Sequence, residues 1–433
     1  MTDSIRFEGG MGEGGMEIVR RLAEAGHAAY FVGGCVRDAL LGRAVKDIDI
    51  ATSAKPEAVL ELFPNAIPTG LKHGTVTIPL RDWQYEVTTF RAESEYSDGR
   101  RPDEVVFIDD VEGDLERRDF TVNAMAVGAD GRLVDPFGGR RDLAAKMLRA
   151  VGDPAERFGE DALRMLRFVR FAAEYGFAPD ERTWAEAKAG APGLAAIAME
   201  RVFGELSRMI AGADPYRALR LLAESELLRW TKERLRLPRE LGLAAGVSDD
   251  PLPRLARVPD ELARWALWFD RMGLGPEEAD RACKALRTSG AFADAIRRTL
   301  GLHAHLRGAP EAAARRSWIT GALRYGEETS RRWLALAAAA AETEPYGWAA
   351  RYVDSGPLWL AEMSARTLKE LAISGADVLA AAEGRKAGPW LQALLQRLLE
   401  HTALGELPNE REALLAQARV WLAESDGRKR DGI

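Results

Sequence analysis

Residues 31–50 read FVGGCVRDALLGRAVKDIDI, and this stretch indicates the fold of the first part of the chain. The apolar residues that end at Val32 lead into two glycines, as a buried strand does when it enters a tight turn. Further on, Asp47 and Asp49 alternate with isoleucines, which is the pattern of a second strand. Because side chains two positions apart leave the same face of a strand, we expect both carboxylates to point at one spot.

These residue types suit a nucleotide site. Two carboxylates aimed together fit Mg²⁺, which takes hard oxygen ligands and leaves positions for water and for phosphate oxygens of a substrate. Gly34 lets backbone N–H groups approach a phosphate, and Arg37 can donate to phosphate oxygens. Glu86, in a predicted strand over 84–90, is a candidate third carboxylate. Exposed acids on an ordinary strand surface give the same patterns, so neither is decisive alone.

The remaining pattern predicts an α+β head followed by a long helical part. Strands are expected over 28–32, 75–80, 84–90 and 105–108, and a helix over 16–25. Strand signals end near Asp153, beyond which Ala, Leu, Arg and Glu predominate. We expect the following division: a flexible glycine-rich arm (1–15), a head (16–150), and helical segments over 151–212, 213–310 and 311–433.

Composition excludes several classes of protein. The 433 residues are 47% hydrophobic and 29% charged, as in globular proteins with more than one folding unit. The longest apolar run, 333–341, is too short to cross a bilayer, and no secretory leader is visible. With Cys35 and Cys283 as the two cysteines, we expect reduced thiols in a cytoplasmic protein. A net charge of −7 argues against indiscriminate coating of nucleic acid, but allows a local basic groove.

Two further motifs carry charged residues at helical spacing. The first is RRDFTVNA over 117–124, which as a helix would place Arg118 to hold phosphate or sugar. The second is EDALRMLRFVR over 160–170, in which a helix would bring the charged side chains onto one half and the apolar ones onto the other. Those charged residues are Asp161, Arg164, Arg167 and Arg170. Ordinary Arg–Asp pairs on a surface helix fit both spacings equally well.

An Asp161–Arg164 pair has the chemistry to read a base. Cytosine and adenine each present an amino group beside a ring nitrogen, so the carboxylate can accept from the first and the guanidinium can donate to the second. Uracil and guanine present the reversed order and would leave both groups unpaired. The pair would therefore accept CTP and ATP and refuse UTP and GTP.

As an ordered set, these motifs resemble the tRNA nucleotidyltransferase / poly(A) polymerase family, specifically the class II bacterial CCA-adding enzymes. The resemblance covers nearly the whole chain after the glycine-rich arm. It implies a polymerase-β-like head with a mixed sheet and helices, followed by all-α neck, body and tail domains. It also implies roles for single residues: Asp47 and Asp49 as metal ligands; Gly34, Arg37 and Arg118 at the phosphates; Asp161 and Arg164 at the base edge; Arg167 and Arg170 as supports of the nucleotide.

The resemblance further implies the reaction and its partners. The 3′-hydroxyl of tRNA would attack the α-phosphorus of CTP or ATP with the help of Mg²⁺, without a template, and release pyrophosphate. The intact polar stretch 91–102 favours complete CCA addition. An enzyme that adds only the final A is the closest alternative, and a poly(A) polymerase a more distant one. Whether the protein is a monomer or a homodimer stays open.

Overall fold

The computed structural model describes residues 5–93, 105–238, 240–243, 250–382 and 385–430. The chain forms two compact units, Met1–Leu235 and Arg236–Ile433. The first unit holds a mixed sheet with helices, and the described part of the second is helical. The predicted α+β head followed by helices is therefore confirmed, while the finer borders between neck, body and tail stay predictions.

A mixed sheet of seven strands, in the order β3-β4-β5-β2-β1-β8-β9, forms the centre of the first unit. Neighbouring strands are antiparallel except for β2 and β5, which are parallel. The strands predicted over 28–32, 75–80 and 84–90 are confirmed to within one residue, whereas the strand predicted around Asp47 and Asp49 begins only at Asp49. The bounds are β1 (Ala29–Val32), β2 (Asp49–Thr52), β3 (Ile67–Gly70), β4 (Thr75–Leu80), β5 (Trp83–Thr89), β8 (Ala126–Gly128) and β9 (Leu133–Val134).

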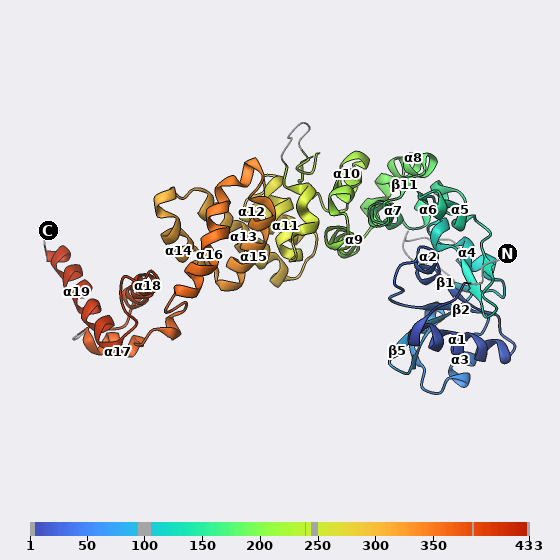
Figure 1. Ribbon diagram of the computed structural model, residues 1–433, viewed down its shortest axis with the longest axis horizontal. Coiled ribbons are helices and arrows are strands. Elements are labelled where there is room, and N and C mark those ends of the chain that lie inside the picture. Colours follow the sequence, from blue (N-terminus) through green and yellow to red (C-terminus); the bar gives the residue numbers. More distant parts are fainter. Residues whose placement is uncertain (1–4, 94–104, 239, 244–249, 383–384, 431–433) are drawn as a thin grey trace. The chain divides into compact units, whose positions relative to one another are not determined.

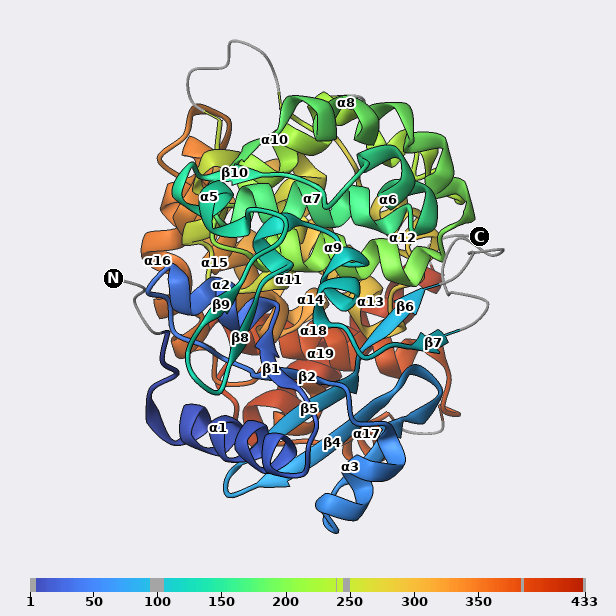
Figure 2. The same ribbon diagram turned by 90° about the vertical axis from the view of Figure 1, so that its right-hand side faces the viewer.

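The two faces of this sheet differ. Helices α1 (Gly9–Glu24) and α3 (Pro56–Leu62) pack on one face (Figure 1, Figure 2). Alternation along β5 explains why: Tyr85 is buried on the covered side, whereas its neighbour Glu86 is exposed on the other. The side that carries Glu86 is called the open face below; α4 (Val111–Glu116) covers its part over β1 and β2.

A second, two-stranded sheet joins β6 (Arg91–Glu93) to β7 (Val105–Phe107). The predicted strand over 105–108 is thus confirmed. The polar stretch 91–102 begins with a strand, because its first three residues pair with β7. The rest of the stretch, on which the preference for complete CCA addition depends, lies outside the described residues.

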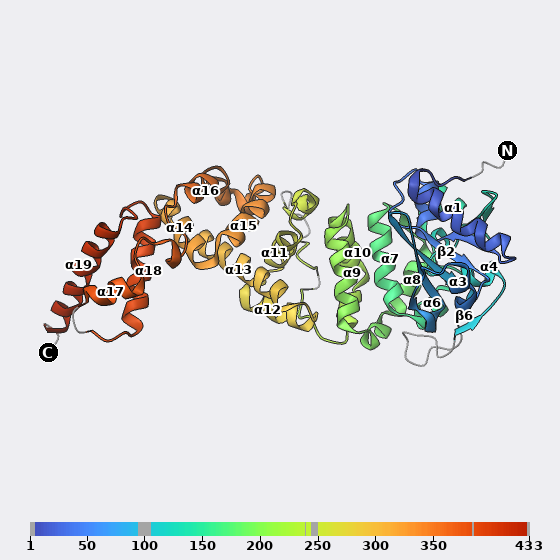
Figure 3. The same cartoon turned by 90° about the horizontal axis from the view of Figure 1, so that it is seen from below.

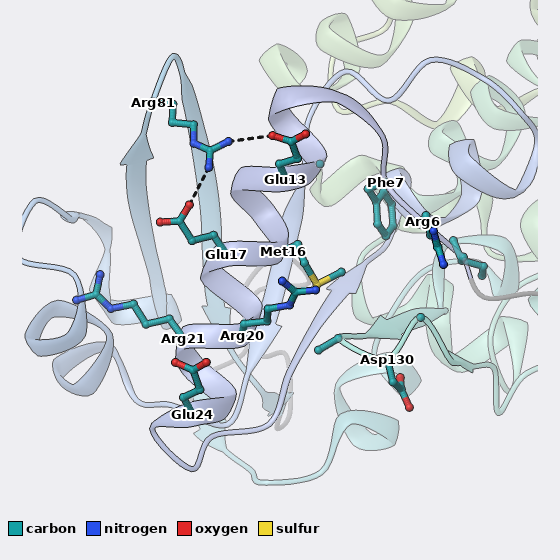
Figure 4. A pocket seen from close by; sticks show the side chains of 14 residues that line it. Arg6, Phe7, Glu13, Met16, Glu17, Arg20, Arg21, Glu24, Arg81 and Asp130 are labelled. Carbon is teal, nitrogen blue, oxygen red and sulfur yellow. Dashed lines mark hydrogen bonds and ion pairs between the residues drawn. The ribbon is translucent and has the colours of Figure 1, made fainter.

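The prediction of a flexible arm is wrong for residues 9–15, because α1 already begins at Gly9. The glycines of this segment permit close packing instead of flexibility. A Cβ atom on Gly14 would lie 2.3 Å from the hydroxyl oxygen of Tyr85, which itself donates to the carbonyl of Met11 at 2.9 Å. Charges fasten the same helix from outside: Arg81, in the β4–β5 turn, forms ion pairs with Glu13 and Glu17 (Figure 4).

Replacing Gly14 with alanine should therefore destabilise the protein. The added methyl group would clash with Tyr85, and overpacking of this kind costs about 1–3 kcal/mol, more than the helix propensity that alanine gains. Thermal unfolding measures the effect. Gly10→Ala is the matched control in the same helix, because its Cβ would meet only Trp83 at an ordinary 3.7 Å. Equal melting temperatures for the two variants would contradict this account.

Helices complete the first unit. Helix α7 packs against α9 and α10 (Figure 3), and aspartates cap several N-termini, such as Asp153 before α6 and Asp214 before α10. A short parallel pair, β10 (Met147–Leu148) and β11 (Ala178–Pro179), is an exception to the prediction that strands end near Asp153. The helices are α2 (Gly34–Leu40), α4 (Val111–Glu116), α5 (Gly139–Ala144), α6 (Pro154–Glu160), α7 (Leu163–Glu174), α8 (Glu181–Ala189), α9 (Met199–Ala211) and α10 (Pro215–Ser225).

Apolar side chains are buried in several parts of the second unit, around Trp265 and Trp268 on α11 as well as in two further clusters. Aromatic side chains such as Trp318, Trp333 and Tyr352 fill the first, and α17, α18 and α19 enclose the second (Figure 1). No helix in the described residues is long and apolar enough to cross a membrane. The main helices are α11 (Glu261–Arg271), α12 (Pro276–Ala285), α13 (Gly290–Arg307), α14 (Ala314–Tyr325), α15 (Glu327–Ala340), α16 (Ala350–Glu362), α17 (Gly375–Ala381), α18 (Pro389–Ala403) and α19 (Arg411–Arg430).

A buried histidine lies beside the first of these two clusters. Trp333 donates its indole N–H to Nδ1 of His303 at 3.3 Å, and Nε2 of His303 lies 3.4 Å from the carboxylate of Asp270. Tyr346 donates its hydroxyl to the same carboxylate. A nitrogen that accepts a hydrogen bond carries no proton, so His303 is neutral. Burial lowers the pKa of His303 below 6.5, and the positive charge of Arg307 acts in the same direction, against Asp270.

The stability of the second unit should consequently fall in mild acid. Because the pKa of His303 is lower in the folded than in the unfolded chain, its contribution is complete above about pH 6.5 and is lost as the pH falls toward the folded value. Thermal unfolding between about pH 7.5 and pH 5 measures this loss. His303→Asn, which cannot be protonated, should show a weaker pH dependence, and the control His27→Asn should keep all of it. An unchanged dependence in His303→Asn would refute the assignment.

Candidate active site

The glycine turn follows β1 and opens α2. Gly33 has a φ of +72°, in the left-handed region that favours glycine. A Cβ atom there would lie 2.7 Å from Nη1 of Arg118, so only glycine lets this guanidinium lie against the turn. The register pairs Val32, just before the turn, with Asp49 of β2. The turn, Arg118 and Asp49 are thereby brought together, as predicted from three separate stretches of sequence.

Asp49 lies among other acids. It is the first residue of β2, whereas Asp47 precedes the strand, so the prediction that both stand on one strand is wrong. Glu86 is the register partner of Asp49 across the parallel pair β2–β5, which puts both side chains on the open face. Desolvation raises the pKa of Asp49 to about 6, and repulsion by Asp47 and Glu86 adds to the shift, while Arg118 opposes it.

This donor set fits a divalent cation. The mutual repulsion that raises the pKa of Asp49 is what a cation between the carboxylates would relieve. Within the part of the chain that the structure describes, no group of three or more His, Cys, Asp or Glu side chains is arranged to hold a metal. Two carboxylates are nevertheless sufficient for Mg²⁺, which keeps several waters and binds substrate phosphates. The role of Glu86 as a third ligand stays a prediction.

The motif over 117–124 is not one helix, contrary to prediction. Helix α4 ends at Glu116, and residues 121–123 form a separate 3-10 turn. Arg117 and Arg118 follow Asp114 at the helical spacings of three and four residues, and the buried Asp114 carboxylate accepts from Arg117 at 2.7 Å and from Arg118 at 3.3 Å. Asp114 was not singled out from the sequence. It holds Arg118 where the guanidinium faces both the glycine turn and the acidic residues.

Arg37 is buried, with a relative exposure of 6%, and its guanidinium is held on several sides. It donates to Asp38 at 2.9 Å and to the side-chain oxygen of Asn123, and it lies 4.4 Å from the ring centroid of Tyr175. Its Nη2 atom is 3.5 Å from where a Cβ of Gly34 would be. Arg37 therefore stands beside the glycine turn as predicted, but all three of its guanidinium nitrogens already donate to protein side chains.

From Asn123 the contacts continue to α7. Asn123 donates its amide to Asp119 at 3.0 Å, and Asp119 accepts two bonds from Arg167, at 2.9 and 2.6 Å. Although burial alone would raise the pKa of Asp119, Arg167 and Asn123 hold it below its ordinary value. Arg37, Asn123, Asp119 and Arg167 thus form one chain of hydrogen bonds between α2 and α7. In this arrangement Arg167 braces the site, and its predicted contact with a nucleotide is untested.

Asp161 is not on the helix that carries the arginines, because α7 begins only at Leu163. It lies in extended backbone between α6 and α7, and its carboxylate accepts from both terminal nitrogens of Arg201, at 3.2 and 2.7 Å. The Leu163 amide donates to the same carboxylate at 3.1 Å. No i,i+3 pattern could have indicated Arg201, which is on α9.

The three arginines of α7 do not form one row, contrary to prediction. Arg164 pairs with Glu160 and donates to the carbonyl of Arg117 at 3.1 Å, which ties the start of α7 to the motif over 117–124. Arg170 instead bonds Glu205 on α9 at 2.7 Å and Glu174 at 3.0 Å. The predicted helical face is thus divided: Arg164 and Arg167 contact the head motifs, and Arg170 joins α7 to α9.

Comparisons with known proteins agree with this arrangement. Residues 29–149 match the model of the poly A polymerase head domain, residues 176–234 that of a probable RNA and SrmB-binding site of polymerase A, and residues 256–418 that of a putative tRNA nucleotidyltransferase domain 2. The chain is 38% identical over 409 residues to the CCA-adding enzyme of Geobacillus stearothermophilus, which covers 94% of this chain and 95% of the relative. It is 36% identical over 400 residues to that of Limosilactobacillus reuteri, with 92% and 94% covered.

Solved structures are similar to this chain as well. The crystal structure of the Bacillus stearothermophilus CCA-adding enzyme in complex with CTP superposes with a TM-score of 0.80 at 34% identity, covering 98% of this chain and 100% of that one. The Thermotoga maritima CCA-adding enzyme, solved with tRNA, shares the fold with a TM-score of 0.66 at 20% identity, covering 96% and 97%. The polymerase-β-like head expected from the sequence is confirmed by these matches. Motifs, fold and comparisons together show that the chain belongs to the family of CCA-adding tRNA nucleotidyltransferases.

Proposed function

We propose that this protein adds CCA to the 3′ end of tRNA from CTP and ATP, without a template, and releases pyrophosphate. The observation that carries the proposal is the placement of Asp49, which is level with the glycine turn on one side and paired with Glu86 on the other. The relatives that match along almost the whole chain are CCA-adding enzymes, so the A-adding and poly(A) alternatives are not favoured. The cytoplasm is the compartment that we propose.

The reaction joins the 3′-oxygen of the RNA to the α-phosphorus of the incoming nucleotide and breaks the bond to pyrophosphate. When bound by Asp47 and Asp49, Mg²⁺ would supply a Lewis acid for the phosphoryl oxygens. Arg118, held by Asp114 against the glycine turn, provides positive charge for the leaving phosphates. The chain of hydrogen bonds through Asn123 and Asp119 keeps Arg37 and Arg167 in fixed positions around that site.

Asp161 and Arg164 remain our candidates for reading the base. Three donors already occupy the Asp161 carboxylate, two from Arg201 and one from the Leu163 amide. A carboxylate offers about four lone-pair sites, so one remains for the amino group of cytosine or adenine. The fixed orientation that Arg201 imposes would make this acceptor selective.

Sequencing of RNA 3′ ends tests the proposed function. The protein is incubated with tRNA that ends at the discriminator base, together with CTP, ATP and Mg²⁺, and the extended ends are read. We expect C, C and A in that order and no extension in the presence of a chelator. Extension that stops at CC, or that occurs only on tRNA already ending in CC, would refute complete CCA addition.

A further inference from the structure

One row of residues crosses the open face of the sheet at the level of the acidic site. Residues paired across neighbouring strands project to the same face, so this row is continuous from the glycine turn to the edge strand β3. Its members are Val32 on β1, Asp49 on β2, Glu86 on β5, Thr77 on β4 and Ile67 on β3.

The edge strand of this row is accessible and chemically distinct from the acidic half, whereas Thr77 on β4 is buried, with a relative exposure of 8%. Ile67 is 48% exposed, which is unusual for an aliphatic side chain on an edge strand, and Thr69 beside it is exposed as well. The hydroxyl oxygens of Thr69 and Thr77 lie 2.8 Å apart. Lys72, in the 3-10 turn that follows β3, is exposed. The edge strand and the turn after it therefore combine one accessible hydroxyl group, an accessible aliphatic side chain and a positive charge.

The in-line geometry of the reaction determines which substrate lies over which half of the row. In phosphoryl transfer the attacking and the leaving oxygen lie roughly in line on opposite sides of the phosphorus. The glycine turn and Arg118 stand at the end of β1, so the phosphates that leave lie on that side of Asp49. The attacking 3′-hydroxyl must then approach from the opposite side of Asp49, and the sheet order puts β5, β4 and β3 there.

We propose that Ile67 and Thr69, whose hydroxyl Thr77 holds in place from below, form the surface on which the last nucleotides of the RNA acceptor strand lie, an inference that rests on the proposed function. Two strand spacings, about 10 Å, separate Glu86 from Ile67, enough for one or two nucleotides. Threonine hydroxyls bond ribose 2′-hydroxyls or phosphates, and an aliphatic side chain packs on a ribose or base. Lys72 supplies charge complementary to the RNA backbone.

Opposite charges at one exposed position test this surface. Addition of nucleotides by the full chain is measured against tRNA concentration and, separately, against CTP concentration. Ile67→Glu should raise the KM for tRNA about tenfold by repelling the backbone, whereas Ile67→Lys should leave it equal or lower it. Neither variant should change the KM for CTP. Structural damage would move both variants in the same direction, so the opposite signs identify an electrostatic contact with RNA.

The salt dependence of tRNA binding and a control variant far from this surface add two further tests. The apparent affinity of Ile67→Lys for tRNA should depend more steeply on salt, by about the 0.7 slope of one added phosphate contact. Lys55→Glu, next to α3 on the covered side, should leave the KM for tRNA unchanged. An unchanged KM for tRNA in Ile67→Glu, an equal change in both Ile67 variants, or an equal loss in Lys55→Glu overturns the proposal. A wild-type protein that extends no tRNA would overturn the proposed function instead.

Discussion

Asp49→Asn should abolish nucleotide addition and, in the absence of metal, make the protein more stable. The loss of one of two metal ligands removes several kcal/mol of charge stabilisation, so we expect the rate to fall at least about 10³-fold. Stability should move the other way, because a raised carboxyl pKa means that folding disfavours the charged form, and the pKa of Asp49 is raised to about 6. At neutral pH the uncharged amide therefore relieves repulsion from Asp47 and Glu86.

Melting temperatures with and without divalent metal measure both effects. With a chelator, Asp49→Asn should melt above the wild type, and addition of Mg²⁺ should raise the melting temperature of the wild type alone. Asp82→Asn is the matched control, since Asp82 is an exposed aspartate in the β4–β5 turn of the same unit. Retained activity in Asp49→Asn would show that Asp49 does not bind the metal. A Mg²⁺-induced rise in the melting temperature of Asp49→Asn equal to that of the wild type would show the same.

Asp161→Ala should relax the choice of base. Sites that hydrogen-bond a substrate reject the wrong analogue by about 10⁴-fold or more, and we expect the preference for CTP over UTP to fall at least about 10²-fold when the acceptor is removed. The ratio of kcat/KM for the two nucleotides measures this preference. The physical reason is that the carboxylate, oriented by Arg201, accepts from an amino group and repels the carbonyl that UTP presents instead.

Two further variants separate base reading from stability. Asp161→Asn keeps the shape of the side chain but adds N–H donors, so it too should admit UTP. Glu174→Ala also removes a carboxylate that pairs with an arginine, but at the far end of α7, and it should lower stability without changing the preference. Equal nucleotide preference in Asp161→Ala and Glu174→Ala would exclude Asp161 from base recognition.

Local sequence patterns were sufficient to predict those parts of the site that a single strand or turn forms. The strand before the glycine turn, the turn itself and Asp49 can be predicted because alternation and glycine report backbone conformation directly. The same reasoning failed at the start of α1, because a glycine that permits contact with Tyr85 has the same letter as a flexible one. Whether such a glycine gives flexibility or close packing depends on β5, a strand that comes much later in the sequence.

Charged residues of α7 were harder to place for a similar reason. Helical periodicity says which side chains share a face, but not that the chain is still extended at Asp161. Nor does it reveal that Arg170 meets Glu205 on another helix. Buried arginines are positioned by distant partners, and a single sequence contains no signal for such pairs.

The parallel pairing of β2 with β5 has a consequence for folding. Antiparallel neighbours can be joined by a tight hairpin, but parallel ones cannot, and here α3, β3 and β4 all lie between the two strands in sequence. Asp49 and Glu86 can meet only after that whole intervening segment has closed on itself, which makes their encounter entropically costly and slow. Catalytic competence should therefore emerge late during refolding, after most of the native helix content has returned.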